Sequence, residues 1–224
     1  MGRAAAFFDL DRTLLRRSST LALAPAFRRH GVITRAQVAK AAFWQLLFVL
    51  RGTSRERVRA ASEEGLMLLR GFSPEQMQAL VAEALEPVLR PLVYGEPLAL
   101  AARHRERGEP TYIVSAALQE VVDALARELG FDGALGTVCE VADGVYTGRG
   151  LRSLHGENKA RAVVELAAEE DIELGASTAY SDSHTDLPFL EVVGNPVVVN
   201  PDRELRRVAE ARGWPVLRFT QRAA

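Results

Sequence analysis

Phe7-Phe8-Asp9-Leu10-Asp11-Arg12-Thr13-Leu14-Leu15 is the stretch around which the rest of the chain is organised. The apolar residues 4–8 have the length of a short buried strand, and the strand ends in acid. Asp9 and Asp11 are two residues apart, so their carboxylates share one face of an extended chain. Two such groups are costly to ionise together unless a cation or proton lies between them. The pattern indicates a site in which Asp9 attacks a phosphoryl group and binds a cation while Asp11 moves protons. A strand followed by a polar turn gives the same local pattern, so the downstream sequence decides.

The composition limits the classes of function. The chain has 224 residues, 48% hydrophobic and 25% charged, which is typical of a globular protein with a sizeable core. A net charge of −1 without a long basic block argues against nucleic-acid binding. The single cysteine, Cys139, excludes an internal disulfide and a multi-cysteine metal site. No signal peptide or run of membrane-spanning length is recognised, so we expect a cytoplasmic protein.

Helical and strand signals divide the chain into two parts. Residues 17–90 carry only helical signals, including Ser73-Pro74-Glu75-Gln76, which is typical of a capped helix start. From residue 94 onward, helices and strands alternate, and Asp143-Gly144 marks a hairpin turn. Strands are expected near 111–115, 134–141, 177–181, 196–200 and 215–219. The sequence therefore predicts an α/β fold with a Rossmann-like, mostly parallel sheet. Residues 1–16 and 91–224 would form the core domain, and 17–90 an inserted, all-helical cap.

Further polar residues lie at or just beyond the carboxyl ends of predicted strands, where ligands bind in parallel sheets. Ser115 ends one strand shortly before a helix, which suggests an anion cradle. Lys159 lies near a helix start, where a cation is disfavoured unless a negative group such as phosphate is nearby. Asp182 ends another strand, and Asp186 follows one helical turn later, so both can face one point. Each signal alone also fits a surface lysine or a helix-capping residue, but their order along one sheet favours a site.

The acidic residues suit a hard divalent cation. Mg²⁺ prefers oxygen ligands and binds through one or two carboxylates together with substrate phosphate and water. Asp9 and Asp182 fit as direct ligands with the backbone carbonyl of Asp11, and Asp186 fits as a residue that orients ligand waters. His184 is interpreted as a surface residue at a helix start.

These residues together resemble the four motifs of the haloacid dehalogenase-like (HAD) phosphatases. The motifs are Asp9-x-Asp11-x-Thr13, Ser115, Lys159 and Asp182-x-x-x-Asp186. The helical insertion resembles the C1 cap of that superfamily, and the chain is most similar to its phosphoserine-phosphatase-like branch, subfamily IB. The resemblance implies a Mg²⁺-dependent phosphoric monoester hydrolase with an aspartyl-phosphate on Asp9. Asp11 would be its acid and base, and Thr13, Ser115 and Lys159 would hold phosphate oxygens.

The sequence departs from phosphoserine phosphatases at the expected substrate contacts. Those enzymes carry a glutamate nine residues after the nucleophile, where this chain has Ser18, and a cap arginine where it has Gly65. Ala116 and Ala117 replace two glycines of the second motif. We therefore expect a small phosphomonoester other than phosphoserine. The alternatives are a phosphoserine phosphatase with a non-standard cap and a phosphotransferase or mutase of the same fold. A phospho-accepting receiver domain is disfavoured by the helical insertion, and a catalytically silent binding protein by the presence of both acids.

Residues 38–50 are apolar except for Lys40 and Gln45. The segment is too short to span a bilayer, but it is more apolar than a cap helix with one buried stripe needs to be. One interpretation is burial in the core of the cap together with a homodimer contact. The other is that the segment rests on a membrane surface or forms an apolar wall for the organic part of an apolar phosphate ester. The residues that would form this wall are Phe43, Trp44, Leu47 and Phe48.

Overall fold

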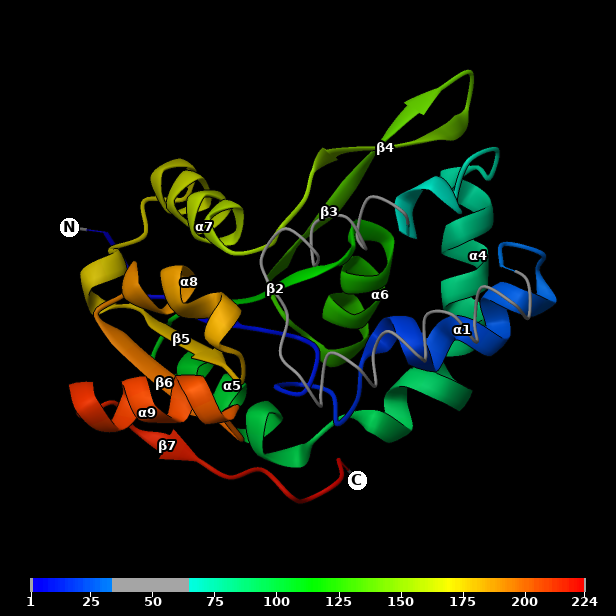
Figure 1. Cartoon of the computed structure of the whole chain (residues 1–224). Helices are drawn as coiled ribbons and strands as arrows, with labels where there is room; N and C mark the ends of the chain where they lie inside the picture. The colour runs from blue at the N-terminus through cyan, green and yellow to red at the C-terminus, as the bar shows by residue number, and fades with distance from the viewer. Residues whose placement is uncertain (1, 34–64, 224) are drawn as a thin grey trace.

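The computed structural model describes residues 2–33 and 65–223 (Figure 1). The apolar segment 38–50 and the rest of residues 34–64, part of the predicted helical insertion, lie outside these residues. Within the described residues, no helix is both long and apolar enough to cross a membrane.

A seven-stranded sheet forms the centre of the molecule, in the order β4-β3-β2-β1-β5-β6-β7. All neighbouring pairs are parallel except β3 and β4, which form an antiparallel hairpin at one edge. Asp143 and Gly144 turn this hairpin with φ of 52° and 78°, as a two-residue turn of this kind requires. The strands are β1 (Ala6–Phe8), β2 (Thr111–Leu118), β3 (Gly133–Ala142), β4 (Val145–Arg152), β5 (Thr178–Ser181), β6 (Asn195–Val199) and β7 (Val216–Leu217). The predicted α/β fold with a mostly parallel sheet is confirmed.

The two faces of the sheet pack into two separate apolar cores. Alternate residues of β1 point to opposite faces, so Phe8 joins one core and Phe7 the other. The core around Phe8 includes helices α5 (Gly95–Glu106) and α6 (Gln119–Leu129). The core around Phe7 includes α7 (Glu157–Glu169), α8 (Leu187–Glu191) and α9 (Arg203–Arg212). Burial on both faces explains why β1 reads as a continuous apolar run.

The described part of residues 17–90 contains helices and turns, as expected. They are α1 (Ser19–Arg29), α4 (Pro74–Ala84), a π-helix (Leu85–Leu89) and a 3₁₀ turn (Arg90–Leu92) that begins at the last residue of this part. The predicted start of α4 is confirmed, because the side chains of Ser73 and Gln76 each accept a hydrogen bond from the other residue's amide. The division into a core and a cap domain remains a prediction.

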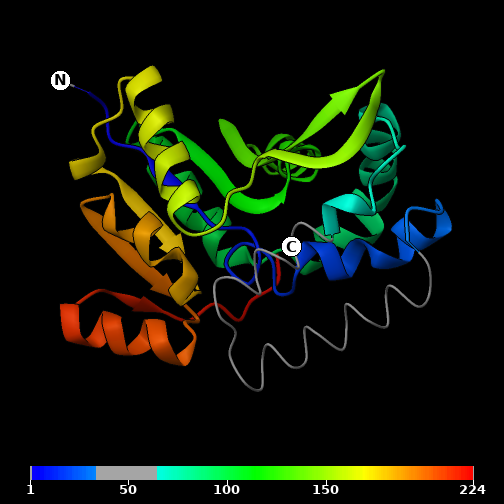
Figure 2. The ribbon, with the colours of Figure 1, turned by 45° about the horizontal axis from the view of Figure 1, so that its top comes forward.

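The β3–β4 hairpin connects the sheet to the α4 region. Its strands extend toward α4 in both ribbon views (Figures 1 and 2). Tyr146 exchanges backbone hydrogen bonds with the loop before α4, donating to the carbonyl of Phe72 and accepting from the amide of Gly71. The Tyr146 hydroxyl also donates to Glu120 Oε1 on α6, at 2.6 Å. One buried tyrosine thus ties the hairpin to both α6 and the helical insertion.

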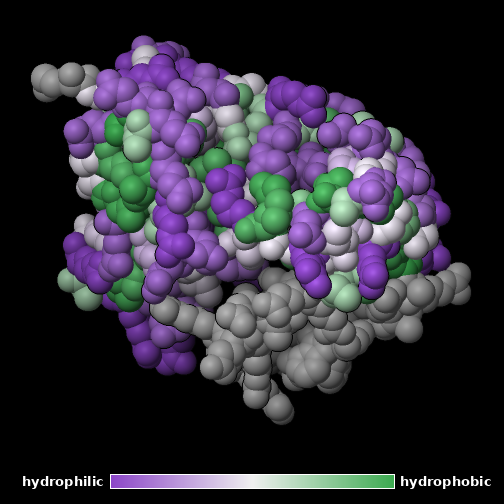
Figure 3. Space-filling view, turned by 90° about the horizontal axis from the view of Figure 1, so that it is seen from above, coloured by the Kyte–Doolittle hydropathy of each residue, from purple (hydrophilic) through white to green (hydrophobic). Residues whose placement is uncertain are grey.

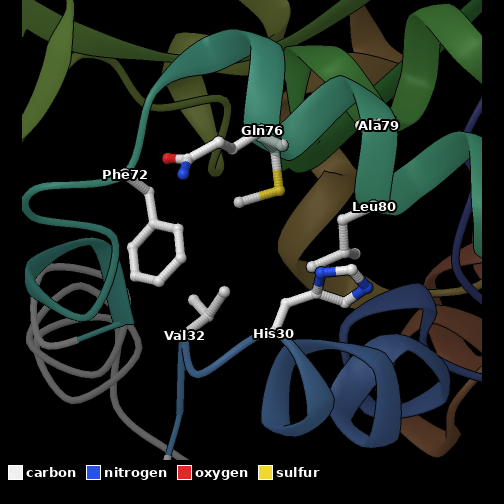
Figure 4. A pocket seen from close by; sticks show the side chains of 7 residues that line it. His30, Val32, Phe72, Gln76, Ala79 and Leu80 are labelled. Atoms are coloured by element: carbon white, nitrogen blue, oxygen red, sulfur yellow. The ribbon is translucent and has the colours of Figure 1, made fainter.

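One face of the surface carries separate apolar patches, and one cavity lies apart from the predicted site residues. On the face seen in Figure 3, apolar side chains form separate patches among polar ones. A cavity of about 160 Å³ lies between the end of α1 and α4 (Figure 4). It is lined by His30, Val32, Phe72, Gln76, Met77, Ala79 and Leu80. None of the predicted site residues is among them.

Two expected strand boundaries were wrong. We expected a strand to end at Ser115, but β2 continues to Leu118 after an irregularity and pairs Leu118 with Thr137. The extension depends on β3, which supplies the hydrogen-bonding partner there. The last strand was expected over 215–219, but β7 covers only Val216 and Leu217, where it pairs with the end of β6.

Candidate active site

Asp9 lies directly after β1, at the carboxyl end of the central strand. Its amide donates to the carbonyl of Tyr180 on β5, at 2.9 Å, which fixes the backbone there. Lys159 Nζ lies 2.6 Å from Asp9 Oδ1 and 2.6 Å from Asp186 Oδ2. All three side chains are buried. The structure thus brings together three residues that are up to 177 positions apart in the sequence.

The start of α7 places Lys159 in this position. Gly156 precedes the helix with φ of 54° and ψ of −121°, a conformation that is essentially restricted to glycine. Burial opposes the charged form of Lys159, but the carboxylates of Asp186 and Asp9 outweigh it and raise the pKa of the lysine. The ammonium also lies 4.7 Å from the centroid of the Phe189 ring. The negative group that the sequence pattern requires near Lys159 is therefore supplied by two carboxylates.

Asp182 follows β5 and is buried close to Asp9. Burial and the charge of Asp9 raise the pKa of Asp182 well above its usual value, and the guanidinium of Arg12 opposes this shift. Arg12 Nη1 lies 3.9 Å from Asp182 Oδ2. Burial likewise raises the pKa of Asp9 to about 7, although Lys159 opposes it. Both carboxylates are therefore in surroundings that favour an additional positive charge.

Asp11 is held by the first turn of α1. Its Oδ1 accepts a hydrogen bond of 2.8 Å from the amide of Ser19. Ser18 precedes the helix, and within the described residues its side chain makes no capping hydrogen bond. Burial raises the pKa of Asp11, and the hydrogen bond from the Ser19 amide opposes the increase. The acidic loop after β1 is in this way connected to the first helix of the insertion.

Thr13 and Ser115 are the two predicted hydroxyl residues, and both are buried. Within the part of the chain that the structure describes, Thr13 Oγ1 has no hydrogen-bond partner. A buried hydroxyl without a partner costs free energy, so Thr13 has a free group for a ligand oxygen. Ser115 Oγ accepts from the amide of Ala117 at 3.1 Å. Both residues lie within β2, so the helix-start amides expected directly after Ser115 are not there, because α6 begins only at Gln119.

Sequence reasoning missed two residues that support the lysine and its partners. Ser181 Oγ donates to Asp186 Oδ2 at 2.7 Å, and Phe189 packs under the Lys159 ammonium. Ser181 stands beside Asp182 at a predicted strand end, so its position could have indicated a role. Phe189 lies in an apolar helix, where its sequence context indicates only burial. His184, interpreted as a surface residue, contacts Asp202 through Nδ1 at 2.9 Å.

The donor set fits a hard cation of the Mg²⁺ type. Asp9 and Asp182 supply oxygen ligands in a buried place, where burial raises the pKa of both and the charge of Asp9 raises that of Asp182 further. Among the described residues, no group of three or more His, Cys, Asp and Glu side chains is arranged as a metal centre. A cation here would therefore use at most two carboxylates and complete its shell with a carbonyl, water and substrate, as Mg²⁺ commonly does.

Comparison with known proteins identifies the family of this chain. The protein-family model for haloacid dehalogenase-like hydrolases matches residues 6–191, from β1 to the end of α8. The chain belongs to this family. The resemblance drawn from the motifs is thus confirmed, and the match contains each of the predicted site residues.

The relatives of this HAD-family chain include named phosphatases. A Mycobacterium tuberculosis (strain H37Rv) protein named probable phosphatase is 42% identical over 219 residues, covering 98% of this chain and 76% of the relative. A second protein of that strain, named phosphoserine phosphatase SerB1, is 36% identical and covers 96% of this chain and 71% of the relative. A crystal structure of a protein with unknown function from Bordetella pertussis is 31% identical, with a TM-score of 0.83. The match covers 97% of this chain and 99% of that one. The enzyme class predicted from the sequence, a HAD-type phosphoric monoester hydrolase, is confirmed by the family match and these relatives.

Proposed function

We propose that this HAD-family chain hydrolyses a small phosphomonoester through an aspartyl-phosphate on Asp9. The observation that carries the proposal is the position of Lys159 Nζ, 2.6 Å from both Asp9 and Asp186 at the carboxyl end of the central strand. Phosphoryl transfer depends mainly on positioning and charge neutralisation. A buried cation held against the nucleophile supplies both.

In the first step, a carboxylate oxygen of Asp9 bonds to phosphorus and the bond from phosphorus to the ester oxygen breaks. Asp11 donates its proton to that oxygen, so the alcohol leaves uncharged. The burial that raises the pKa of Asp11 favours the protonated form that this step needs. In the second step, Asp11 takes a proton from the attacking water, the bond from phosphorus to Asp9 breaks, and inorganic phosphate is released.

The other site residues would hold the phosphate and its counter-ion. Thr13 and Ser115 would donate hydroxyls to phosphate oxygens, and Lys159 would neutralise their charge. Mg²⁺ would be held by Asp9, Asp182 and the carbonyl of Asp11, with Asp186 orienting its waters. When bound, the ion neutralises phosphate charge and orients its oxygens. We further propose that residues 17–90 form a cap that determines the substrate.

A phosphate-release screen with Mg²⁺ over a broad panel of phosphorylated metabolites tests the proposal. Asp9→Asn should abolish turnover, because an amide does not attack phosphorus, and Asp11→Asn should lower kcat by about 10²–10⁴-fold. Chelation by EDTA should stop the reaction, and added Mg²⁺ should restore it. Asp143→Asn in the exposed hairpin turn is a matched control and should leave activity unchanged. Near-normal turnover by folded Asp9→Asn would refute the proposed mechanism.

A further inference from the structure

Arg12 stands in the acidic loop with a backbone conformation that is unfavourable for a side-chain-bearing residue. Its φ is 66°, in the left-handed region that glycine adopts without strain. The turn is fixed by the amides of Leu14 and Leu15, which both donate to the carbonyl of Leu10. Arginine therefore carries a conformational cost here that glycine would avoid.

Among the described residues, the guanidinium of Arg12 makes one long ion pair and no hydrogen bond. Its ion pair with Asp182 measures 3.9 Å, which is beyond hydrogen-bonding distance. No hydrogen bond of the Arg12 side chain is found within residues 2–33 and 65–223, and this side chain is 42% exposed. By contrast, Arg107 donates two hydrogen bonds to Glu109. The planar set of donors on Arg12 thus remains available at the edge of the site.

Arg12 differs in this respect from Lys159, the buried cation next to Asp9. Lys159 is 1% exposed, and its ammonium is engaged by Asp9 and Asp186. Arg12 is the exposed partner of its ion pair, since its side chain is 42% exposed and that of Asp182 only 7%. A substrate whose phosphate meets Asp9 would therefore bring its neighbouring atoms toward the guanidinium of Arg12.

We infer that Arg12 binds a second anionic group of the substrate and selects phosphate esters that carry one. The inference rests on the proposed phosphatase function. A guanidinium matches the two oxygens of a carboxylate or the oxygens of a second phosphate through paired hydrogen bonds. The preferred substrates are thus small phosphate esters with an acidic group a few atoms from the ester oxygen.

Three esters with the same three-carbon chain test this inference: propyl phosphate, 3-phosphooxypropanoate and propane-1,3-diyl bisphosphate. The wild-type enzyme should prefer at least one acidic ester over propyl phosphate in kcat/KM. Arg12→Gln and Arg12→Gly should lower that preference by about 10- to 100-fold. If the variants lose the preference for 3-phosphooxypropanoate, the group that Arg12 binds is a carboxylate. If they lose the preference for the bisphosphate, it is a second phosphate. Arg207→Gln, which removes an exposed arginine on α9, should leave the preference unchanged.

Binding provides a readout that does not depend on turnover. In an Asp9→Asn background, calorimetric titration should show the same preference among the three esters, and Arg12→Gln should remove it. Equal losses for all three esters would mean that Arg12 acts on the scissile phosphate or on the cation site, and would overturn the inference. An unchanged preference in both Arg12 variants would also overturn it while the phosphatase remains active. Failure to release phosphate from any ester in the broad panel would overturn the proposed function itself.

Discussion

The aromatic ring of Phe8 stacks on that of Tyr180, with ring centroids 4.4 Å apart and planes inclined by 14°. The two residues are register partners on β1 and β5. Asp9 follows Phe8, and Asp182 lies two residues after Tyr180. The stack therefore fixes the relative position of the two strand ends that carry the buried acids.

Two substitutions of Tyr180 separate the stack from its hydroxyl. Tyr180→Phe keeps the ring but removes the hydrogen bond of 2.8 Å between the hydroxyl and His104 Nε2. It should lower the free energy of unfolding by about 1–2 kcal/mol with kcat preserved within a few-fold. Tyr180→Leu removes the stack and should lower kcat at least tenfold more than Tyr180→Phe. Urea unfolding and steady-state kinetics measure both, and equal kcat losses in the two variants would contradict this role of the stack.

Lys159 provides a second prediction, because it is the buried counter-ion of two carboxylates. Lys159→Met would leave Asp9 and Asp186 buried without their partner, which should lower the free energy of unfolding by about 3–5 kcal/mol. Arg161→Met removes a charge from the exposed side of the same helix and should cost less than about 1 kcal/mol. Denaturant unfolding in EDTA gives both values. Similar small losses in the two variants would show that the buried ammonium does not balance the carboxylates.

Local patterns in the sequence predicted much of the fold. Asp143-Gly144 indicated the hairpin because a tight two-residue turn needs positive φ at both positions. Ser73 and Gln76 indicated the start of α4 because their reciprocal hydrogen bonds form within four residues. The acidic residues indicated the carboxyl edge of the sheet because parallel strands end at a common edge.

Features that depend on distant partners were not predictable in this way. The extension of β2 beyond Ser115 requires a pairing with β3 that no local pattern contains. The approach of Lys159 to Asp9 requires the whole sheet to form, although the helix-start position of Lys159 indicated a negative partner. The positive φ of Arg12 was equally hidden, since arginine is not a residue that marks left-handed backbone.

Stability at acid pH should depend on Glu109. Hydrogen bonds from the guanidinium of Arg107, with a further contribution from His104, lower the pKa of Glu109 to about 2 in the folded protein. The unfolded carboxyl titrates near its ordinary value of about 4.3. Its contribution to stability is therefore complete above that pH and is lost as the pH falls toward 2.

Glu109→Gln should accordingly be less stable than the wild type at pH 7, and the difference should shrink between pH 5 and pH 3. Glu106→Gln, at the exposed end of α5, is the matched control and should show no such change. Urea unfolding at several pH values measures both. A difference between Glu109→Gln and the wild type that stays constant from pH 7 to pH 3 would exclude this carboxylate as a source of the acid sensitivity.

The last prediction concerns the ammonium group of phosphoserine. Ser18 occupies the position of the glutamate that the phosphoserine-phosphatase-like pattern places nine residues after Asp9, and it lies directly before α1. A serine hydroxyl cannot balance the charge of an ammonium that loses its water on binding. O-phosphoserine differs from 3-phosphooxypropanoate only by that ammonium, so we expect phosphoserine to be the poorer substrate in kcat/KM.

Ser18→Glu should raise the ratio of kcat/KM for phosphoserine to kcat/KM for 3-phosphooxypropanoate by about tenfold or more. A glutamine side chain has nearly the size of glutamate but carries no charge. Ser18→Gln should therefore leave the ratio near its wild-type value. A wild-type enzyme that prefers phosphoserine would show that another residue pairs with the ammonium, and an equal gain in Ser18→Gln and Ser18→Glu would show that size rather than charge controls this position.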